Sequence, residues 1–317
     1  MSDTITLDQL RELYPIINHE YSKYVGPLSA QFLPQRRAGD PPLPILYHYS
    51  DVNALKGVIE NHSIWATNCG YMNDRSEVLY GTEALSGALI ASQSVILNQK
   101  MPIDQQIFDN LILSLQEHNG FRCYAACLSF NGDQLSQWRG YGCFGSGYSI
   151  GFDALSLTHD FSTIAEPIEL SYDPKSLQNT AATFVSYLTN VLQSIPEHLK
   201  IVGADVIRQF LELHITSYAI RYKHYKFEEE REFRFAVSES PDDPIPLDDI
   251  KLRTSNNLVV PYLTLGKGSH EILPIREIII GPRLDHEKAE YSVRKLLQQN
   301  GYDLSTITIK PSEIPFV

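Results

Sequence analysis

The stretch His224-Tyr-Lys-Phe-Glu-Glu-Glu-Arg-Glu-Phe-Arg-Phe-Ala-Val237 alternates charged and apolar side chains toward its C-terminal end. Phe233, Phe235 and Val237 recur at every second position, which is typical of a strand with one buried face. The opposite face of this strand then carries Glu230, Glu232 and Arg234. A solvated strand can show the same pattern, so the function of this face depends on the partners that the rest of the chain supplies.

The composition is that of a soluble globular protein with enough residues for a sizeable core. The chain has 317 residues, of which 43% are hydrophobic and 20% are charged. No apolar run reaches the roughly 18–20 residues of a membrane span, and the N-terminus lacks the basic start and apolar core of a signal peptide. We therefore expect a cytoplasmic protein without a membrane partner.

Charge and cysteine spacing narrow the expected partners further. The formal net charge of −12 disfavours nucleic acid as a partner, although a local basic cleft remains compatible with it. The spacing of the four cysteines matches no common zinc pattern, so we expect reduced, buried thiols and no metal site. These cysteines are Cys69, Cys123, Cys127 and Cys143.

Periodicity and capping residues divide the chain into an N-terminal arm and an α+β core within a single elaborated domain, residues 1–317. The arm, residues 1–44, combines a helix over 4–24, with Thr6 as its N-cap, and an extended proline-rich segment. The core is residues 45–317. Predicted strands cover 45–50, 63–67, 121–130, 149–153, 161–172, about 230–237, 258–265 with an interruption at Pro261, 275–281 and 306–310. Predicted helices cover 51–60, 77–98, 103–117, 175–194, 197–222 and 285–299.

These elements predict the α+β class. We expect a mostly antiparallel sheet with interleaved helices and a helical insertion around residues 175–222.

His48 lies in the first predicted strand between Tyr47 and Tyr49. A histidine in the middle of a strand is often a satisfied core residue. The flanking tyrosines and the helix that begins directly after this strand favour a ligand cleft instead. His48 and Tyr49 are therefore candidate binding residues.

A second candidate region runs from Gln137 to Tyr148 and is rich in glycine and aromatic residues. Aromatic faces can sandwich a planar heterocycle, arginine can pair with a pyrophosphate, and glycine lets backbone amides approach a ligand. The alternative is a hairpin of core aromatic residues with a flexible tip. The candidate binding residues here are Trp138, Arg139, Tyr141 and Tyr148.

Several short motifs lie between residues 45 and 285, namely Leu46-Tyr-His-Tyr49, Ile64-Trp-Ala-Thr67 with Asn73-Asp74, Cys127-Leu-Ser-Phe130, Gln137-Trp138 with Tyr141-Gly142, Gly151-Phe-Asp153 and Glu230-x-Glu232-x-Arg234. Together they resemble the bacterial family of unknown function DUF2971. The order of a histidine on a strand, an aromatic turn and a Glu-x-Glu strand is also similar to the NAD site of the ADP-ribosyltransferase superfamily. That resemblance implies an ADP-ribosyltransferase-like split sheet.

The resemblance implies an NAD-dependent ADP-ribosyltransferase, or an NAD glycohydrolase if water is the acceptor. Glu232 would bind the 2′-hydroxyl of the nicotinamide ribose and stabilise the oxocarbenium-like charge that develops when the bond to nicotinamide breaks. Glu230 would position or deprotonate an acceptor of unknown identity. The resemblance also suggests a bacterial accessory role, in a defence or toxin module.

The remaining NAD contacts follow from the same resemblance. His48 would hydrogen-bond the ribose next to adenine or the amide region of nicotinamide, and Tyr148 or Tyr141 would stack on the nicotinamide ring. Arg139 or Arg75 would hold the pyrophosphate.

The sequence departs from the superfamily in lacking a Ser-Thr-Ser strand and in the long interval between Tyr148 and Glu232, which a helical insertion accommodates. Two other hypotheses stay open. One is a non-catalytic nucleotide-sensing module that acts with a partner protein, in which Arg234 neutralises Glu232 structurally. The other is a metal-dependent hydrolase built on His48, Asp74 and the glutamates.

Overall fold

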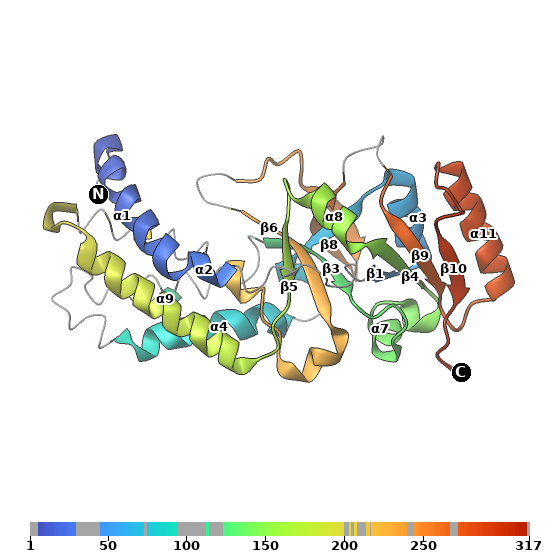
Figure 1. Ribbon diagram of the computed structural model, residues 1–317, viewed down its shortest axis with the longest axis horizontal. Helices are drawn as coiled ribbons and strands as arrows, with labels where there is room; N and C mark the ends of the chain where they lie inside the picture. Colours follow the sequence, from blue (N-terminus) through green and yellow to red (C-terminus); the bar gives the residue numbers. More distant parts are fainter. Residues whose placement is uncertain are drawn as a thin grey trace, which may run out of the picture.

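The computed structural model describes residues 6–29, 45–72, 75–93, 109, 112–113, 123–199, 203, 206–207, 214–215, 217–239, 244–255, 257–266 and 272–315. The protein is α+β, with helices at both ends of the molecule and a mostly antiparallel open sheet between them (Figure 1). Helices α1 (Leu7–Tyr24), α4 (Arg75–Ala91) and α9 (Pro174–Ser194) lie together at one end. None of the helices within the described residues is long and apolar enough to cross a membrane.

The start of the N-terminal helix is fixed by its N-cap residue. In α1 the Gln9 backbone N–H donates to Thr6 Oγ1 at 3.3 Å, and the Thr6 N–H donates to Gln9 Oε1 at 2.8 Å, which forms a capping box. Pro15 lies inside the helix, which continues to Tyr24. The proline-rich segment was predicted to be extended, but it begins with the short helix α2 (Gly26–Ser29), and residues 30–44 lie outside the described part.

The sheet follows the order β10-β9-β4-β1-β3-β2-β8-β7, with β6 paired to β3 and β5 paired to β6. Only the pairing of β10 with β9 is parallel among the described strands. The strands are β1 (Ile45–Ser50), β2 (Ile64–Asn68), β3 (Cys123–Ser129), β4 (Tyr148–Asp153), β5 (Glu166–Glu169), β6 (Glu232–Ser238), β7 (Lys251–Ser255), β8 (Leu258–Leu265), β9 (Ile275–Ile280) and β10 (Thr308–Pro311).

Strand β3 is where the sheet branches. One of its edges pairs with β6 over its whole length, from Cys123↔Ser238 to Ser129↔Glu232. The other edge pairs with β2 near its start, at residues 124–125, and with β1 near its end, at Ser129. Strands β1 and β2 therefore diverge along this edge and leave the middle of β3 without a strand partner on that side.

Strand β6 is shorter than its sequence pattern indicates. Residues Tyr225–Glu230 form a 3-10 helix, η5, which ends at Arg231 with a left-handed φ of 43°. The prediction that Glu230 shares a strand face with Glu232 and Arg234 is therefore wrong, because β6 begins at Glu232. Residues 232–236 are all buried, so the polar face of this strand is not solvated.

Two further elements differ from their sequence patterns. The predicted strand over 161–172 is confirmed only at β5, because α8 (Ala154–Phe161), which begins after a cap at Asp153, occupies the first position and a turn follows over residues 162–164. Pro261 does not interrupt β8, which pairs continuously with β7, a strand that the sequence analysis missed. Most of the remaining strands, with α3 (Val52–Asn61) and α11 (His286–Gln299), lie within a few residues of their predicted bounds.

The helical insertion between β5 and β6 is confirmed by α9. Of the helix predicted over 197–222, residues 203, 206–207, 214–215 and 217–219 are helical, and most of the others lie outside the described part. The same holds for the helix predicted over 103–117, of which only residues 109 and 112–113 are described.

Two hydrophobic clusters pack on opposite faces of the sheet. The first is formed by α1, α4 and α9 against alternate residues of β3 and β6, such as Ala125 and Ala236. The second is formed by α3, α8 and α11 against the intervening residues, such as Ala126 and Phe235. Because successive side chains of a strand point to opposite faces, β3 and β6 contribute to both clusters.

Candidate functional site

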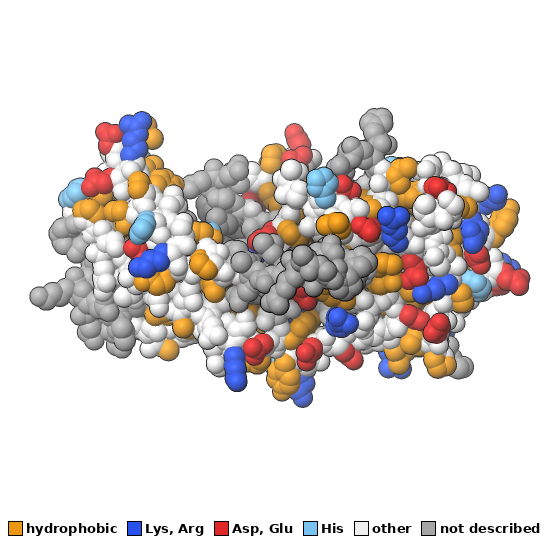
Figure 2. Space-filling view, viewed as in Figure 1, with side chains coloured by type: hydrophobic (Ala, Val, Ile, Leu, Met, Phe, Trp, Pro, Cys, Tyr) orange, Lys and Arg blue, Asp and Glu red, His pale blue; other side chains and the backbone are white. Residues whose placement is uncertain are grey.

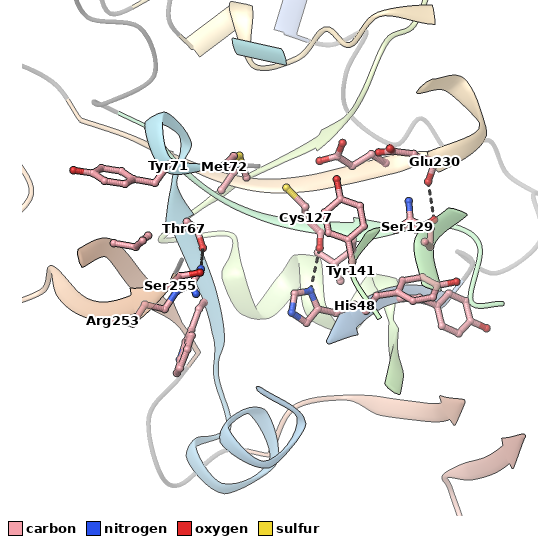
Figure 3. A pocket seen from close by; sticks show the side chains of 18 of the residues that line it. His48, Thr67, Tyr71, Met72, Cys127, Ser129, Tyr141, Glu230, Arg253 and Ser255 are labelled. Carbon is pink, nitrogen blue, oxygen red and sulfur yellow. Dashed lines mark hydrogen bonds between the residues drawn. The ribbon is translucent and has the colours of Figure 1, made fainter. Parts of the chain in front are cut away.

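A cavity of about 210 Å³ lies on the face of the sheet that is turned toward the first hydrophobic cluster (Figure 3). It runs from β7 past β2 and β3 to β6, and β1 lines it where β1 and β2 diverge. The lining residues are Tyr47, His48, Tyr49, Trp65, Thr67, Tyr71, Met72, Ala125, Cys127, Leu128, Ser129, Gln137, Tyr141, Glu230, Glu232, Arg253, Ser255, Leu258 and Val260.

His48 fills the gap between β1 and β2. Its Nδ1 lies 3.1 Å from the backbone carbonyl oxygen of Cys127, in the part of β3 that lacks a strand partner on this side. A carbonyl can only accept, so Nδ1 carries the proton and Nε2 keeps its lone pair. Burial lowers the pKa of His48, which favours this neutral form. His48 therefore satisfies a backbone group and also lines the cavity.

Glu232 stands at the opposite side of the cavity and is held by two cations. Arg234 donates from Nε to Oε1 at 2.5 Å and from Nη2 to Oε2 at 3.1 Å, and Lys223 Nζ lies 3.1 Å from Oε2. Burial raises the pKa of this carboxyl, which is 6% exposed, but Arg234 and Lys223 outweigh burial and lower it to about 2. Glu232 is thus a fixed anion at neutral pH.

Glu230 lines the cavity beside Glu232, although it lies in η5 and not in the strand. Lys223 Nζ donates to Glu230 Oε2 at 2.5 Å, so one buried lysine contacts both carboxylates. The Ser129 hydroxyl donates to the Glu230 backbone carbonyl at 2.7 Å (Figure 3). These contacts fix the turn whose last residue is Glu230.

The glycine-rich segment reaches the cavity through Gln137 and Tyr141, at the C-terminal end of helix α7 (Leu135–Gly140). Tyr141 is 41% exposed and so forms part of the rim. The start of α7 is anchored by Tyr49, whose hydroxyl donates to the Asn131 carbonyl at 2.8 Å and accepts from the Gln134 N–H at 3.0 Å.

Three residues predicted from the same segment lie outside the cavity lining. Trp138 is fully buried, packs edge-on against Tyr49 and donates from Nε1 to Asp133 at 2.6 Å. Arg139 is exposed at the end of α7. Tyr148 is buried in the second hydrophobic cluster, at the start of β4. The structure thus brings His48, Tyr49, Tyr141, Glu230 and Glu232 together, and it does not bring Trp138, Arg139 and Tyr148 to the same cavity.

The sequence analysis missed the end of the cavity that β2, β7 and β8 form. Arg253 and Ser255 point into this end of the cavity from β7. The guanidinium carbon of Arg253 lies 5.9 Å from the centroid of the Trp65 ring. Arg253 Nη2 donates to Thr67 Oγ1 at 3.3 Å (Figure 3). The residues of β7, Lys251-Leu-Arg-Thr-Ser255, have too few apolar side chains for a clear strand signal, so periodicity gave no reason to select Arg253.

The cysteines and acidic residues form no metal site within the described part of the chain. No three histidine, cysteine, aspartate or glutamate side chains converge there, and Asp74, which the metal hypothesis needs, lies outside it. None of the four cysteines forms a disulfide. The prediction of buried thiols is confirmed for Cys69 and Cys123 but is wrong for Cys143, which is exposed, whereas Cys127 is half-buried.

Charged residues of both signs are interspersed on the face that Figure 2 shows, among the residues described there. The one strong concentration of ionic contacts described above is internal, where Lys223 and Arg234 meet Glu230 and Glu232. The electrostatic character of the candidate site therefore comes from its buried groups.

Comparison with known proteins finds a similarity to part of this chain. No curated protein and no solved structure has a significant similarity to this chain. A family model matches residues 137–235, a segment that begins at Gln137 in the cavity lining and includes Tyr141, Glu230 and Glu232. Residues 137–235, about a third of the chain, match the sequence model of DUF2971, described as a protein of unknown function, so this segment is similar to that family.

Proposed function

We propose that this protein cleaves the bond between nicotinamide and ribose in NAD and transfers ADP-ribose to an acceptor or to water. The observation that carries this proposal is that Glu230 and Glu232 line one cavity with His48 and Tyr141, although these residues are far apart in the sequence. Such convergence of polar groups in a cavity is a common property of ligand sites.

The reaction needs a stable anion beside the sugar. As the C1′–N bond breaks, nicotinamide leaves with the bonding electron pair and becomes neutral, while positive charge develops on C1′ and the ring oxygen. The acceptor then bonds to C1′ and loses a proton. Glu232 is suited to stabilise the positive charge because Arg234 and Lys223 hold it ionised with a pKa of about 2.

Glu232 has room for one ligand hydrogen bond. A carboxylate offers about four lone-pair positions, of which Arg234 takes two and Lys223 takes one. The Cys127 thiol approaches the same carboxylate and is a weak donor. A ribose 2′-hydroxyl is a stronger donor and would displace it.

The low pKa of Glu232 also excludes it as a general base, because a carboxylate with a pKa of about 2 is too weak a base to accept a proton at neutral pH. Deprotonation of an acceptor is therefore assigned to Glu230, whose carboxylate lines the same cavity and contacts Lys223. His48 Nε2, the unprotonated ring nitrogen, would accept a hydrogen bond from the ligand.

The size of the cavity sets how much of NAD it can enclose. Its volume of about 210 Å³ is below the roughly 300–1,000 Å³ that is usual for pockets enclosing drug-sized ligands. We assign this space to the nicotinamide and its ribose, with Tyr141 at the rim stacking on the nicotinamide ring and the adenosine outside. The divergence of β1 and β2 beside the cavity supports an ADP-ribosyltransferase-like arrangement as part of this proposal.

A second candidate function is a non-catalytic nucleotide-binding module that acts with a partner protein. The contacts of Glu232 with Arg234 and Lys223 favour it, because a carboxylate in a buried ion network can serve only to support the fold. In that case the cavity binds a nucleotide without cleaving it, and Glu232 is a positioning residue.

The test is nicotinamide release from NAD by the purified protein, with and without cell lysate as a source of acceptors. Glu232→Gln removes the charge at nearly constant shape, and we expect it to lower the rate at least a hundredfold. Glu229→Gln is the matched control, because Glu229 is an exposed neighbour outside this cavity. Assays are run well below the melting temperature of each variant.

The outcomes separate the two functions. Release that persists in Glu229→Gln and is lost in Glu232→Gln supports glycosidic cleavage. NAD binding without release in the wild type, unchanged in Glu232→Gln, supports the binding module. Should Glu232→Gln not fold, Glu230→Gln provides the second variant, because it leaves the contacts of Glu232 with Lys223 and Arg234 in place. Absence of both NAD binding and release from the wild type contradicts both functions.

A further inference from the structure

Arg253 lines one end of the cavity, and the proposed reaction has not yet given it a contact with the ligand. It points from β7 toward β2, where Nη2 donates to Thr67 Oγ1 and the guanidinium lies near the face of Trp65. Ser255 lines the cavity from the same strand face two residues later. A cation and two hydroxyl groups therefore surround this end of the cavity.

The guanidinium of Arg253 can donate further hydrogen bonds to a ligand. Among the described residues it forms no ion pair, and its Nε is buried without a hydrogen-bond partner. A buried donor of a charged group that stays unsatisfied destabilises the protein. Arginine also presents its donors as a planar fork that matches phosphate oxygens. Both properties fit a ligand anion.

The two ends of the cavity are lined by side chains of opposite charge, with Arg253 at one end and the carboxylates that pair with Lys223 and Arg234 at the other. The guanidinium of Arg253 reaches β2, whereas the carboxylate of Glu232 projects from β6, and β3 lies between these two strands. Thr67 pairs with Ala125 and Glu232 pairs with Ser129, four residues further along β3. With strands about 4.8 Å apart and a rise of about 3.3 Å per residue, the backbones of Thr67 and Glu232 are roughly 16 Å apart. The side chains that project into the cavity from both ends shorten this distance, and a ribose with a phosphate on its 5′-oxygen spans what remains when a hydrogen bond is added at each end.

We propose that Arg253, together with Thr67 and Ser255, is the subsite for the 5′-phosphate of the nicotinamide nucleotide. This inference rests on the proposed function and names the group that the second end of the cavity recognises. It replaces Arg139 and Arg75 as the expected phosphate ligands, because Arg139 does not line the cavity and the side chain of Arg75 lies outside the described part.

The experiment compares two ligands that differ only by the phosphate. Carbocyclic analogues of nicotinamide mononucleotide and nicotinamide riboside, in which a methylene replaces the ring oxygen, resist cleavage and allow calorimetric titration. Hydrogen bonds to charged groups contribute about 1.5–3 kcal/mol, so we expect the wild type to bind the phosphorylated analogue roughly 10- to 150-fold more tightly. Arg253→Gln should reduce this preference to about threefold or less while keeping its affinity for the riboside analogue.

Lys251→Gln is the matched control, since Lys251 is an exposed cation on the same strand two residues before Arg253 and does not line the cavity. It should keep the full preference for phosphate, whereas a general charge effect would change both variants alike. Arg253→Lys retains the charge without the planar fork, and we expect an intermediate preference. Melting temperatures of all variants confirm folding.

Inorganic pyrophosphate provides an independent probe of the subsite. If it raises the melting temperature of the wild type and of Lys251→Gln but not of Arg253→Gln, the anion subsite is supported even when neither analogue binds, and the proposed NAD chemistry is then wrong. If both analogues bind and Arg253→Gln keeps the phosphate preference and the pyrophosphate response, the subsite is overturned and the nicotinamide site stands. Equal binding of the two analogues by the wild type, without any pyrophosphate response, also overturns the subsite.

Discussion

Lys223 connects the two carboxylates of the cavity, and its side chain is 1% exposed. A buried ammonium is stable only when it is paired, so Lys223 depends on Glu230 and Glu232 as much as they depend on it. Arg234 extends the network through Glu232 and donates to the Ile220 carbonyl at 3.0 Å. The network therefore joins β6 to the chain segment that precedes η5.

Replacing Glu232 by glutamine should destabilise the protein strongly at neutral pH. The change leaves Lys223 and Arg234 with one counter-charge fewer in a buried place, and we expect a loss of about 3–5 kcal/mol in the free energy of unfolding. Urea denaturation at pH 7 measures it. Glu229→Gln, at an exposed position, should change the same quantity by about 0.5 kcal/mol or less.

The effect of Glu232→Gln on the free energy of unfolding should also depend on pH. The pKa of Glu232 falls from 4.5 in the unfolded chain to about 2 in the fold, so the unfolded state binds more protons between these values. The stabilisation by Glu232 is complete above the unfolded pKa and is lost as the pH falls through the folded pKa. The difference in unfolding free energy between wild type and Glu232→Gln should therefore shrink from pH 5 toward pH 2. A difference that stays constant over this range would contradict the ion network.

At the scale of elements, helix α4 provides an internal comparison of two glycines. A Cβ atom on Gly81 would lie 2.3 Å from the Ala219 carbonyl oxygen, so this glycine is required for close contact with the helical residues 217–219. Gly87 lies on the same helix, is exposed, and has nothing within 4 Å of an added Cβ. The two positions differ in packing but not in the kind of element.

Alanine at these two positions should have opposite effects. Gly81→Ala forces backbone apart and should destabilise the protein by about 1–3 kcal/mol. Gly87→Ala removes conformational freedom from the unfolded chain and should stabilise the protein by about 0.5–1 kcal/mol. Urea denaturation of both variants measures this. Equal effects of the two substitutions would show that α4 does not pack against residues 217–219 as described.

At the scale of the whole molecule, the sheet couples the two hydrophobic clusters. Strands β3 and β6 present alternate residues to each cluster, and α1 packs on α9 within the first cluster. Unfolding either cluster would therefore expose one face of the same strands. This arrangement favours a single cooperative transition.

Two optical probes test this expectation. Both tryptophans, Trp65 and Trp138, lie in the sheet part of the protein, whereas α1, α4 and α9 contribute strongly to the far-ultraviolet circular dichroism. We expect tryptophan fluorescence and circular dichroism to report the same urea midpoint. A lower midpoint by circular dichroism would instead indicate that the helical end unfolds separately from the sheet.

The sequence alone determined the elements whose signals are local. Thr6 and Asp285 cap helices that begin within three residues of their predicted starts, and apolar periodicity located most of the strands. These features depend on neighbouring residues, because capping and side-chain alternation act over a few positions. The same local patterns identified His48, Tyr141 and the two glutamates as candidates, and the cavity contains all four.

Only the tertiary structure decided what surrounds these residues. The left-handed backbone at Arg231 moves Glu230 out of the strand, and helices packed over β6 bury a face that the sequence pattern leaves open to solvent. Trp138 satisfies its indole N–H inside the core, while Arg253 reaches the cavity from a strand with no clear signal. Burial and pairing depend on groups distant in the sequence, so no local pattern can specify them.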